Sequence, residues 1–134
     1  MPSTRGASHV ALTVRDMEAS AAWYQRVFGW IELQRLAAHE AGTPRIVLFD
    51  PSSGFALTVC RPEDGQDEGF DHRRTGLDHL AFGVADEAEL DRWLAHLDDN
   101  GIAHSPVRDI GLGKLVSFED PDGIQLELWV NASA

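Results

Sequence analysis

SHVALTV (residues 8–14) and DHLAFGV (residues 78–84) are two versions of one short alternating strand, and each has a histidine at its second position. His9 and His79 lie 70 positions apart in the chain. The same offset recurs in further pairs: Asp16 and Asp86, Trp23 and Trp93, and the Asp-Pro sequences at 50–51 and 120–121. One coincident pair would mean little, whereas an ordered series across both halves indicates an internal duplication.

Each half predicts the same order of elements: a strand, a helix and three further strands. Asp16 and Asp86 stand where a helix N-cap belongs, directly before an amphipathic segment. The later strands are expected at 32–39, 45–50 and 55–60 in the first half and at 103–108, 114–119 and 124–130 in the second. The sequence therefore predicts an α+β protein, a single domain built from two βαβββ modules. These modules span about 7–60 and 77–130, and a polar connector at 61–76 joins them.

The alternation of side chains along these strands separates a bulky face from a face of small residues. His9 and His79 share their faces with alanine, threonine and glycine, opposite a row of valine, leucine and phenylalanine. In the last strand, Glu127 falls opposite Leu126 and Leu128. A sheet face that combines small residues with a few ionisable groups indicates a hollow, whereas the bulky face is expected to pack on the helix.

Composition narrows the class of protein. The chain has 134 residues, is 43% hydrophobic and carries a net charge of −11, which argues against nucleic acid and anionic membranes as partners. It has no apolar run long enough to span a membrane and no signal-peptide pattern at its N-terminus. A single cysteine, Cys60, excludes an internal disulfide, so a cytoplasmic location is expected.

With these motifs in place, the chain resembles the vicinal oxygen chelate superfamily. The family includes glyoxalase I, extradiol dioxygenases, methylmalonyl-CoA epimerase, and the fosfomycin-resistance and bleomycin-resistance proteins. The resemblance covers about residues 7–130 and rests on four phrases: SHVALTV, YQRVFGW, GLDHLAF and FEDPDGIQLELW. It implies that the two modules form a rolled mixed-sheet cup with a divalent metal at its floor.

The resemblance also implies a set of metal ligands. The first histidine of the family falls on His9, the histidine of the second module on His79, and the glutamate of the last strand on Glu127. The fourth position, which holds a carboxylate or carboxamide in glyoxalase I and the epimerase, falls on Thr58. Threonine is a poor ligand for a divalent cation, so the chain departs from the four-ligand pattern there.

Two histidines and one carboxylate form the facial triad of non-haem Fe(II) oxygenases. Among family members, this ligand set is most similar to that of the extradiol dioxygenases. The resemblance therefore implies a metal-dependent enzyme that chelates its substrate through vicinal oxygens. Fe(II) or Mn(II) is the favoured metal, and Ni(II) or Zn(II) are the alternatives.

Two other functions stay open. A lyase like glyoxalase I, or an epimerase, would need a fourth metal ligand from water, Thr58 or a partner chain. A metal-free binding protein of the bleomycin-resistance type would use the negative charge and the four tryptophans to hold a cationic drug. The three intact ligand positions argue against the second alternative, because a pure binder does not need them.

Other residues are candidates for contact with a small-molecule substrate. Those expected near it are Thr58, Phe49, Phe118 and Trp129, and the candidate acid–base residues are His72, His39 and His104. Proteins of this size in the family usually pair, so the resemblance also implies a homodimer.

Overall fold

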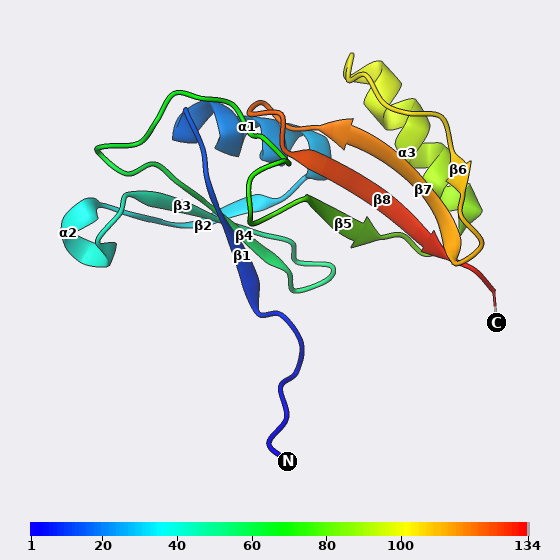
Figure 1. Ribbon diagram of the computed structural model, residues 1–134, viewed down its shortest axis with the longest axis horizontal. Coiled ribbons are helices and arrows are strands. Elements are labelled where there is room, and N and C mark those ends of the chain that lie inside the picture. Colours follow the sequence, from blue (N-terminus) through cyan, green and yellow to red (C-terminus); the bar gives the residue numbers. More distant parts are fainter. Residues whose placement is uncertain (134) are drawn as a thin grey trace. The chain divides into compact units, whose positions relative to one another are not determined.

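The computed structural model describes residues 1–133, and the chain divides into two compact units, Met1–Glu68 and Gly69 onward (Figure 1). The first unit contains β1 (His9–Thr13), α1 (Met17–Phe28), β2 (Ile31–Leu36), α2 (Ala38–Ala41), β3 (Arg45–Phe49) and β4 (Ala56–Cys60). The second contains β5 (His79–Gly83), α3 (Glu87–Asp99), β6 (Arg108–Asp109), β7 (Gly113–Glu119) and β8 (Gln125–Asn131). Apart from α2, both units have the predicted order of a strand, a helix and three strands.

Each unit contains one four-stranded mixed sheet, with strand orders β1-β4-β3-β2 and β5-β8-β7-β6. The pairs β1–β4 and β5–β8 are parallel, and the remaining pairs are antiparallel. The register repeats as well, because Ala11 pairs with Thr58 in the first sheet as Ala81 pairs with Glu127 in the second. The α+β fold class and the duplication are thereby confirmed.

The two long helices begin at the predicted N-caps. The side chain of Asp16 accepts a hydrogen bond from the backbone N–H of Ala19, and that of Asp86 accepts one from Glu89. Each bond satisfies a backbone donor that has no partner within the helix, which stabilises it by about 1 kcal/mol. Helix α1 ends at Gly29, whose φ of 72° lies in the left-handed region that glycine adopts without strain.

Each helix buries one apolar face within its own unit. Helix α1 contributes Tyr24 and Val27 to the first core, and α3 contributes Leu90 and Leu97 to the second. Burial of each such side chain stabilises the folded state by roughly 1.5–3 kcal/mol, because its apolar surface is removed from water. The strands supply further fully buried residues: Ile46, Leu48, Leu57, Val59, Val116, Leu126 and Leu128.

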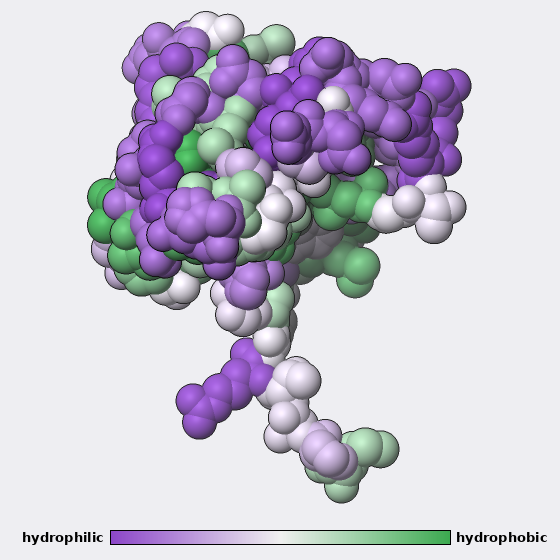
Figure 2. Space-filling view, turned by 90° about the vertical axis from the view of Figure 1, so that its left-hand side faces the viewer, coloured by the Kyte–Doolittle hydropathy of each residue, from purple (hydrophilic) through white to green (hydrophobic). Residues whose placement is uncertain are grey.

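The space-filling view in Figure 2 shows hydrophilic residues over most of the visible surface, with smaller hydrophobic patches between them. Within residues 1–133, none of the helices has both the length and the apolar character needed to cross a bilayer.

The segment predicted as a strand over 32–39 ends earlier, and a short helix follows it. Strand β2 stops at Leu36, and α2 covers Ala38–Ala41. Alanine and glutamate favour helix at this point, and the Glu40 carboxylate accepts a 2.7 Å hydrogen bond from the backbone N–H of Ala37. His39 therefore lies on a helical turn and not on a strand.

The strand predicted over 103–108 is reduced to Arg108–Asp109. Pro106 has no backbone N–H, so it cannot donate to a strand ladder. The segment before it makes isolated contacts with β7: a bridge between His104 and Phe118, a 2.8 Å bond from Ser105 N–H to the Ser117 carbonyl, and a 2.9 Å bond from Ser117 N–H to Ser105 Oγ.

The connector at 61–76 consists of turns and irregular backbone, and the boundary between the units falls inside it. The guanidinium of Arg61 holds its first part together. It donates to the carbonyl of Gly65 over 3.0 Å and forms an ion pair with Asp67 at 2.8 Å.

Candidate metal centre

The first strand of each sheet presents its histidine on the more exposed face. In β1, His9, Ala11 and Thr13 are exposed whereas Leu12 is buried. In β5, His79, Ala81 and Gly83 are exposed, and the residues between them are half-buried. The alternation predicted from the sequence is therefore present, and both histidines lie on the face of small residues.

Cross-strand pairing shows which residues share the face of His79. Direct partners in neighbouring strands point to the same side of a sheet. Three rows cross this face of the second sheet: His79–Gln125–Glu119, Ala81–Glu127–Ser117 and Gly83–Trp129–Leu115. Glu127 consequently lies in the row next to that of His79.

The side chains of His79 and Glu127 meet across these rows. Their Nε2 and Oε1 atoms lie 3.3 Å apart. The Glu127 side chain is only 8% exposed, whereas that of His79 is 41% exposed. The second carboxylate oxygen, Oε2, accepts hydrogen bonds from Gln125 Nε2 at 3.0 Å and from Ser117 Oγ at 3.4 Å. Glu127 is thus held by one oxygen, while the other faces the imidazole.

The residue before each histidine contacts its Nδ1 atom. Asp78 Oδ1 lies 2.8 Å from Nδ1 of His79, and Ser8 Oγ lies 3.1 Å from Nδ1 of His9. A carboxylate that accepts the Nδ1 proton fixes the tautomer in which Nε2 carries a lone pair. For His79 this is the nitrogen that faces Glu127, and it is therefore available as a metal ligand.

The pair fits a divalent cation in donor chemistry and in spacing. Imidazole nitrogen and carboxylate oxygen suit Mn, Fe, Ni and Zn. Two ligands that are each about 2.0–2.2 Å from one cation lie about 3.0–3.4 Å apart. The separation of 3.3 Å between His79 Nε2 and Glu127 Oε1 falls in that range. Across residues 1–133, no group of three or more histidine, cysteine, aspartate or glutamate side chains is assembled for metal binding.

In the first sheet, two predicted substrate residues share the face of His9. The rows there are His9–Ala56–Phe49 and Ala11–Thr58–Val47. Thr58 is 5% exposed and occupies the register position that Glu127 has in the second sheet. The repeat alignment that assigned Thr58 to this position is therefore matched by the strand register.

The two predicted aromatic residues of the second sheet lie on opposite faces. Trp129 lies on the Glu127 face, beside Leu115. Phe118 pairs with Leu126, is 3% exposed and belongs to the core. The expectation that Phe118 lines a substrate site is therefore wrong. Strand β7 runs so that Ser117, and not Phe118, faces the same side as Glu127.

Of the acid–base candidates, His104 is on the side of the sheet away from Glu127. It bridges to Phe118, and its ring nitrogens lie 2.7 Å from the Ser105 carbonyl and 2.8 Å from Asp98 Oδ1 in α3. Both contacts raise the pKa of His104, the backbone carbonyl contributing more. His104 therefore connects α3 to the sheet. We assign it a structural role in place of the predicted acid–base role. His39 on α2 and His72 in the second unit are both exposed.

Sequence reasoning did not assign roles to four neighbours of this pair: Asp78, Ser117, Gln125 and Arg108. Asp78 could have been found as the residue directly before a candidate ligand. Gln125 is two residues before Glu127 and therefore on its face. Ser117 and Arg108 could not have been found, because their placement depends on the register of β7 with β8 and β6.

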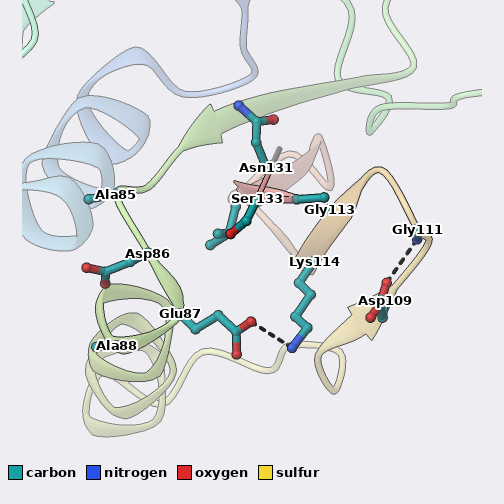
Figure 3. Close-up of a pocket in the computed structure, with 12 residues that line it drawn as sticks. Ala85, Asp86, Glu87, Ala88, Asp109, Gly111, Gly113, Lys114, Asn131 and Ser133 are labelled. Carbon is teal, nitrogen blue, oxygen red and sulfur yellow. Dashed lines mark hydrogen bonds and ion pairs between the residues drawn. The ribbon is translucent and has the colours of Figure 1, made fainter.

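A cavity of about 550 Å³ lies elsewhere in the second unit, beside the start of α3 (Figure 3). An ion pair of 2.8 Å between Lys114 and Glu87 crosses it. Lys114 pairs with Val130, which lies on the side of the sheet opposite to Glu127. This cavity is therefore distinct from the candidate metal centre.

A family model described as Glyoxalase/Bleomycin resistance protein/Dioxygenase superfamily matches residues 6–128. The protein YwkD of Bacillus subtilis (strain 168), described as uncharacterized, is 30% identical over 123 residues, which cover 90% of this chain and 93% of YwkD. A second protein of that strain, named "Putative ring-cleaving dioxygenase MhqA", is 29% identical over 133 residues. That match covers 94% of this chain, which spans only 40% of the length of MhqA.

Solved structures share the fold. A glyoxylase/bleomycin resistance protein/dioxygenase domain from Frankia sp. EAN1pec has a TM-score of 0.87 and 33% identity, with 98% of this chain and 96% of that chain covered. A FosX variant from Listeria monocytogenes, complexed with Mn(II) and 1S,2S-dihydroxypropylphosphonic acid, has a TM-score of 0.69 and 20% identity, with 97% and 93% of the chains covered. At that identity FosX supports the fold alone.

Proposed function

Because the chain belongs to the Glyoxalase/Bleomycin resistance protein/Dioxygenase superfamily, we propose that it is a metal-dependent enzyme whose cation is held by His9, His79 and Glu127. The observation that carries this proposal is the 3.3 Å contact between His79 Nε2 and Glu127 Oε1, a ligand-like pair within one unit. His9 is proposed as the third ligand because it occupies the same strand position as His79 in the duplicated sheet.

The proposed reaction is an extradiol-type ring cleavage, in which dioxygen is the oxidant and both of its atoms enter a substrate that chelates through two adjacent oxygens. Two imidazoles and one carboxylate leave adjacent coordination positions open, as this chemistry requires. The bound metal, Fe(II) or Mn(II) by preference, would bind the vicinal oxygens and act as a Lewis acid. The likeness to MhqA, 29% identical, supports this reaction class among those of the superfamily.

The residues of the chain have supporting roles in this proposal. Asp78 contacts Nδ1 of His79 and so orients the ring with Nε2 toward the cation, and Gln125 and Ser117 orient the Glu127 carboxylate. Thr58 and Phe49 would contribute a hydroxyl and an apolar surface from the first sheet, and Trp129 would contribute an aromatic surface from the second.

The position of Thr58 disfavours the lyase and epimerase alternatives. Thr58 has the register position of Glu127, and its hydroxyl is a much weaker metal ligand than a carboxylate. A fourth protein ligand would have to come from elsewhere. A metal-free drug-binding role rests on the four tryptophans and on the charge of −11, which solubility also explains.

Elemental analysis of protein purified without oxygen or chelators tests the proposal. We expect about one Fe or Mn per chain in the native protein and less than about a tenth of that in His79→Ala. His39→Ala, a histidine variant on exposed α2, should keep full occupancy. Full occupancy in His79→Ala would remove His79 from the ligand set, and metal-free native protein would favour the binding-protein alternative.

A homodimer is part of the proposal, and its two chains can be tested for a shared site. Sedimentation velocity should give the mass of two chains. Mixing His9→Ala with Glu127→Gln, each defective in metal binding, restores metal-loaded sites only if one site takes ligands from both chains. No restoration in a mixture that exchanges subunits would place all three ligands in one chain.

A further inference from the structure

Arg108 lies on the same face of the second sheet as Glu127. Strand β6 pairs Arg108 with Leu115, which in turn pairs with Trp129 on that face. The side chain of Arg108 extends toward the candidate metal centre, because its Nη2 donates a 2.7 Å hydrogen bond to Ser117 Oγ. That hydroxyl donates to Glu127 Oε2 at 3.4 Å. One hydroxyl group therefore separates the guanidinium from the carboxylate.

The guanidinium of Arg108 has no carboxylate within ion-pair distance among residues 1–133. This is notable in a chain with 22 acidic and 11 basic residues. In the same unit, Lys114 is paired with Glu87, and Arg92 is paired with Glu89. Arg108 is also exposed, so most of its N–H donors are open to a ligand.

Arg45 lies on the His9 face of the first sheet, and its contacts differ from those of Arg108. It is half-buried, and its guanidinium donates to the backbone carbonyls of Thr43 and Ala41. Those bonds hold the turn after α2. Among residues 1–133, Arg108 makes no comparable side-chain bond to the backbone, and the hydroxyl that it contacts leads toward Glu127.

An aromatic surface lies in the same row as Arg108. The indole of Trp129 packs so closely over Gly113 that a Cβ atom at that glycine would lie 3.0 Å from the ring. The indole N–H donates to Asn131 Oδ1 at 2.6 Å, which fixes the ring orientation. A planar ligand beside Trp129 could therefore extend from the Glu127 row to Arg108.

We propose that Arg108 binds an anionic group of the substrate, a carboxylate or a phosphonate, while the vicinal oxygens of the same molecule occupy the metal. This inference rests on the proposed function and narrows its substrate class to small anionic diols, with an aromatic ring favoured. A planar guanidinium binds such groups through paired, charge-assisted hydrogen bonds. Arg108 is accordingly a specificity-determining residue and is not itself a metal ligand.

Two probes of matched size test this role: 3,4-dihydroxybenzoate and its neutral analogue 3,4-dihydroxybenzamide. Their affinities for the Mn(II)-loaded protein can be measured by calorimetry. Hydrogen bonds between ionised partners are about twice as strong as neutral ones, so the benzoate should bind roughly 10-fold tighter than the benzamide. Arg108→Gln, compared at saturating Mn(II), should reduce that preference to about 2-fold or less. Arg26→Gln, an exposed arginine on α1, should keep the native preference.

Three results would overturn the inference, and they separate it from the proposed function. Equal affinities of the native protein for both probes, with Mn(II) bound, would refute the role of Arg108 alone. An undiminished preference for the benzoate in Arg108→Gln would do the same. Failure of the native protein to bind Mn(II) or either probe would refute the proposed function and, with it, this inference.

Discussion

The carboxylate of Asp78 lies 2.8 Å from Nδ1 of His79, on the side of the ring away from Glu127. This contact assigns Nε2 as the nitrogen free to bind a cation. Ser8 contacts His9 in the same way in the first sheet, although with a hydroxyl at 3.1 Å. The duplication has thus preserved an orienting residue before each histidine, and the stronger acceptor stands before His79.

Asp78→Asn is expected to lower metal affinity without removing a ligand. Loss of a carboxylate that orients a metal-binding histidine costs about 10–100-fold in affinity. Titration of the protein with Mn(II), followed by electron paramagnetic resonance, measures the change. Asp64→Asn, in the exposed connector, is the matched control and should bind as the native protein does. Native affinity in Asp78→Asn would show that His79 is oriented by other contacts.

Glu127→Gln is expected to abolish the stabilisation that a bound cation gives. A ligand at 100 times its Kd adds about 2.7 kcal/mol to the free energy of unfolding, so Mn(II) should raise the native Tm by several degrees. The variant keeps the shape of the side chain but loses its charge, so the Mn(II)-dependent rise should largely disappear. Differential scanning fluorimetry with and without Mn(II) measures it. In Glu63→Gln, a variant of the exposed connector, the rise should persist.

Asp120→Ala is expected to destabilise the second unit. Asp120 is 6% exposed, and its Oδ1 accepts hydrogen bonds from the backbone N–H groups of Asp122 at 2.8 Å and Ile124 at 2.9 Å. Leaving those buried donors without an acceptor should cost about 1–3 kcal/mol, measured by urea denaturation. The equivalent Asp50→Ala should cost less, because Asp50 is more exposed. Equal losses of stability in the two variants would show that burial of the aspartate does not determine the cost of removing it.

His104 is expected to make stability depend on pH. Its contacts with the Ser105 carbonyl and Asp98 raise its folded-state pKa above the ordinary value of 6.5. The protonated form is therefore favoured in the folded protein, so its contribution is fully present below about pH 6.5 and is lost as pH rises through the folded pKa. Urea midpoints of the native protein and His104→Ala, compared from pH 5.5 to 8.5, should converge as pH rises. A constant difference would contradict the assigned contacts.

The sequence was sufficient to predict the elements that the duplication repeats. The helix starts follow from Asp16 and Asp86, and the face of each histidine follows from alternation along a short strand. The predicted strand bounds are wrong where one copy differs locally from the other, as at Pro106, which shortens β6 to Arg108–Asp109. The predicted facing of Phe118 is also wrong, because facing in β7 depends on its register with β8.

The surroundings of Glu127 could be predicted only in part for the same reason. Gln125 follows from spacing within one strand, whereas Ser117 and Arg108 come from strands whose register no short motif specifies. Hydrogen bonds between strands thus determine most of the environment of the candidate metal centre.

The threonine at position 58 has an electrostatic consequence. It stands where the second copy has Glu127, so only one of these two equivalent positions carries a carboxylate. In the proposed centre, a divalent cation held by two neutral imidazoles and one carboxylate would keep a formal charge of +1, which a second carboxylate would cancel. Although the chain has a net charge of −11, this residual positive charge would attract monoanions to the centre.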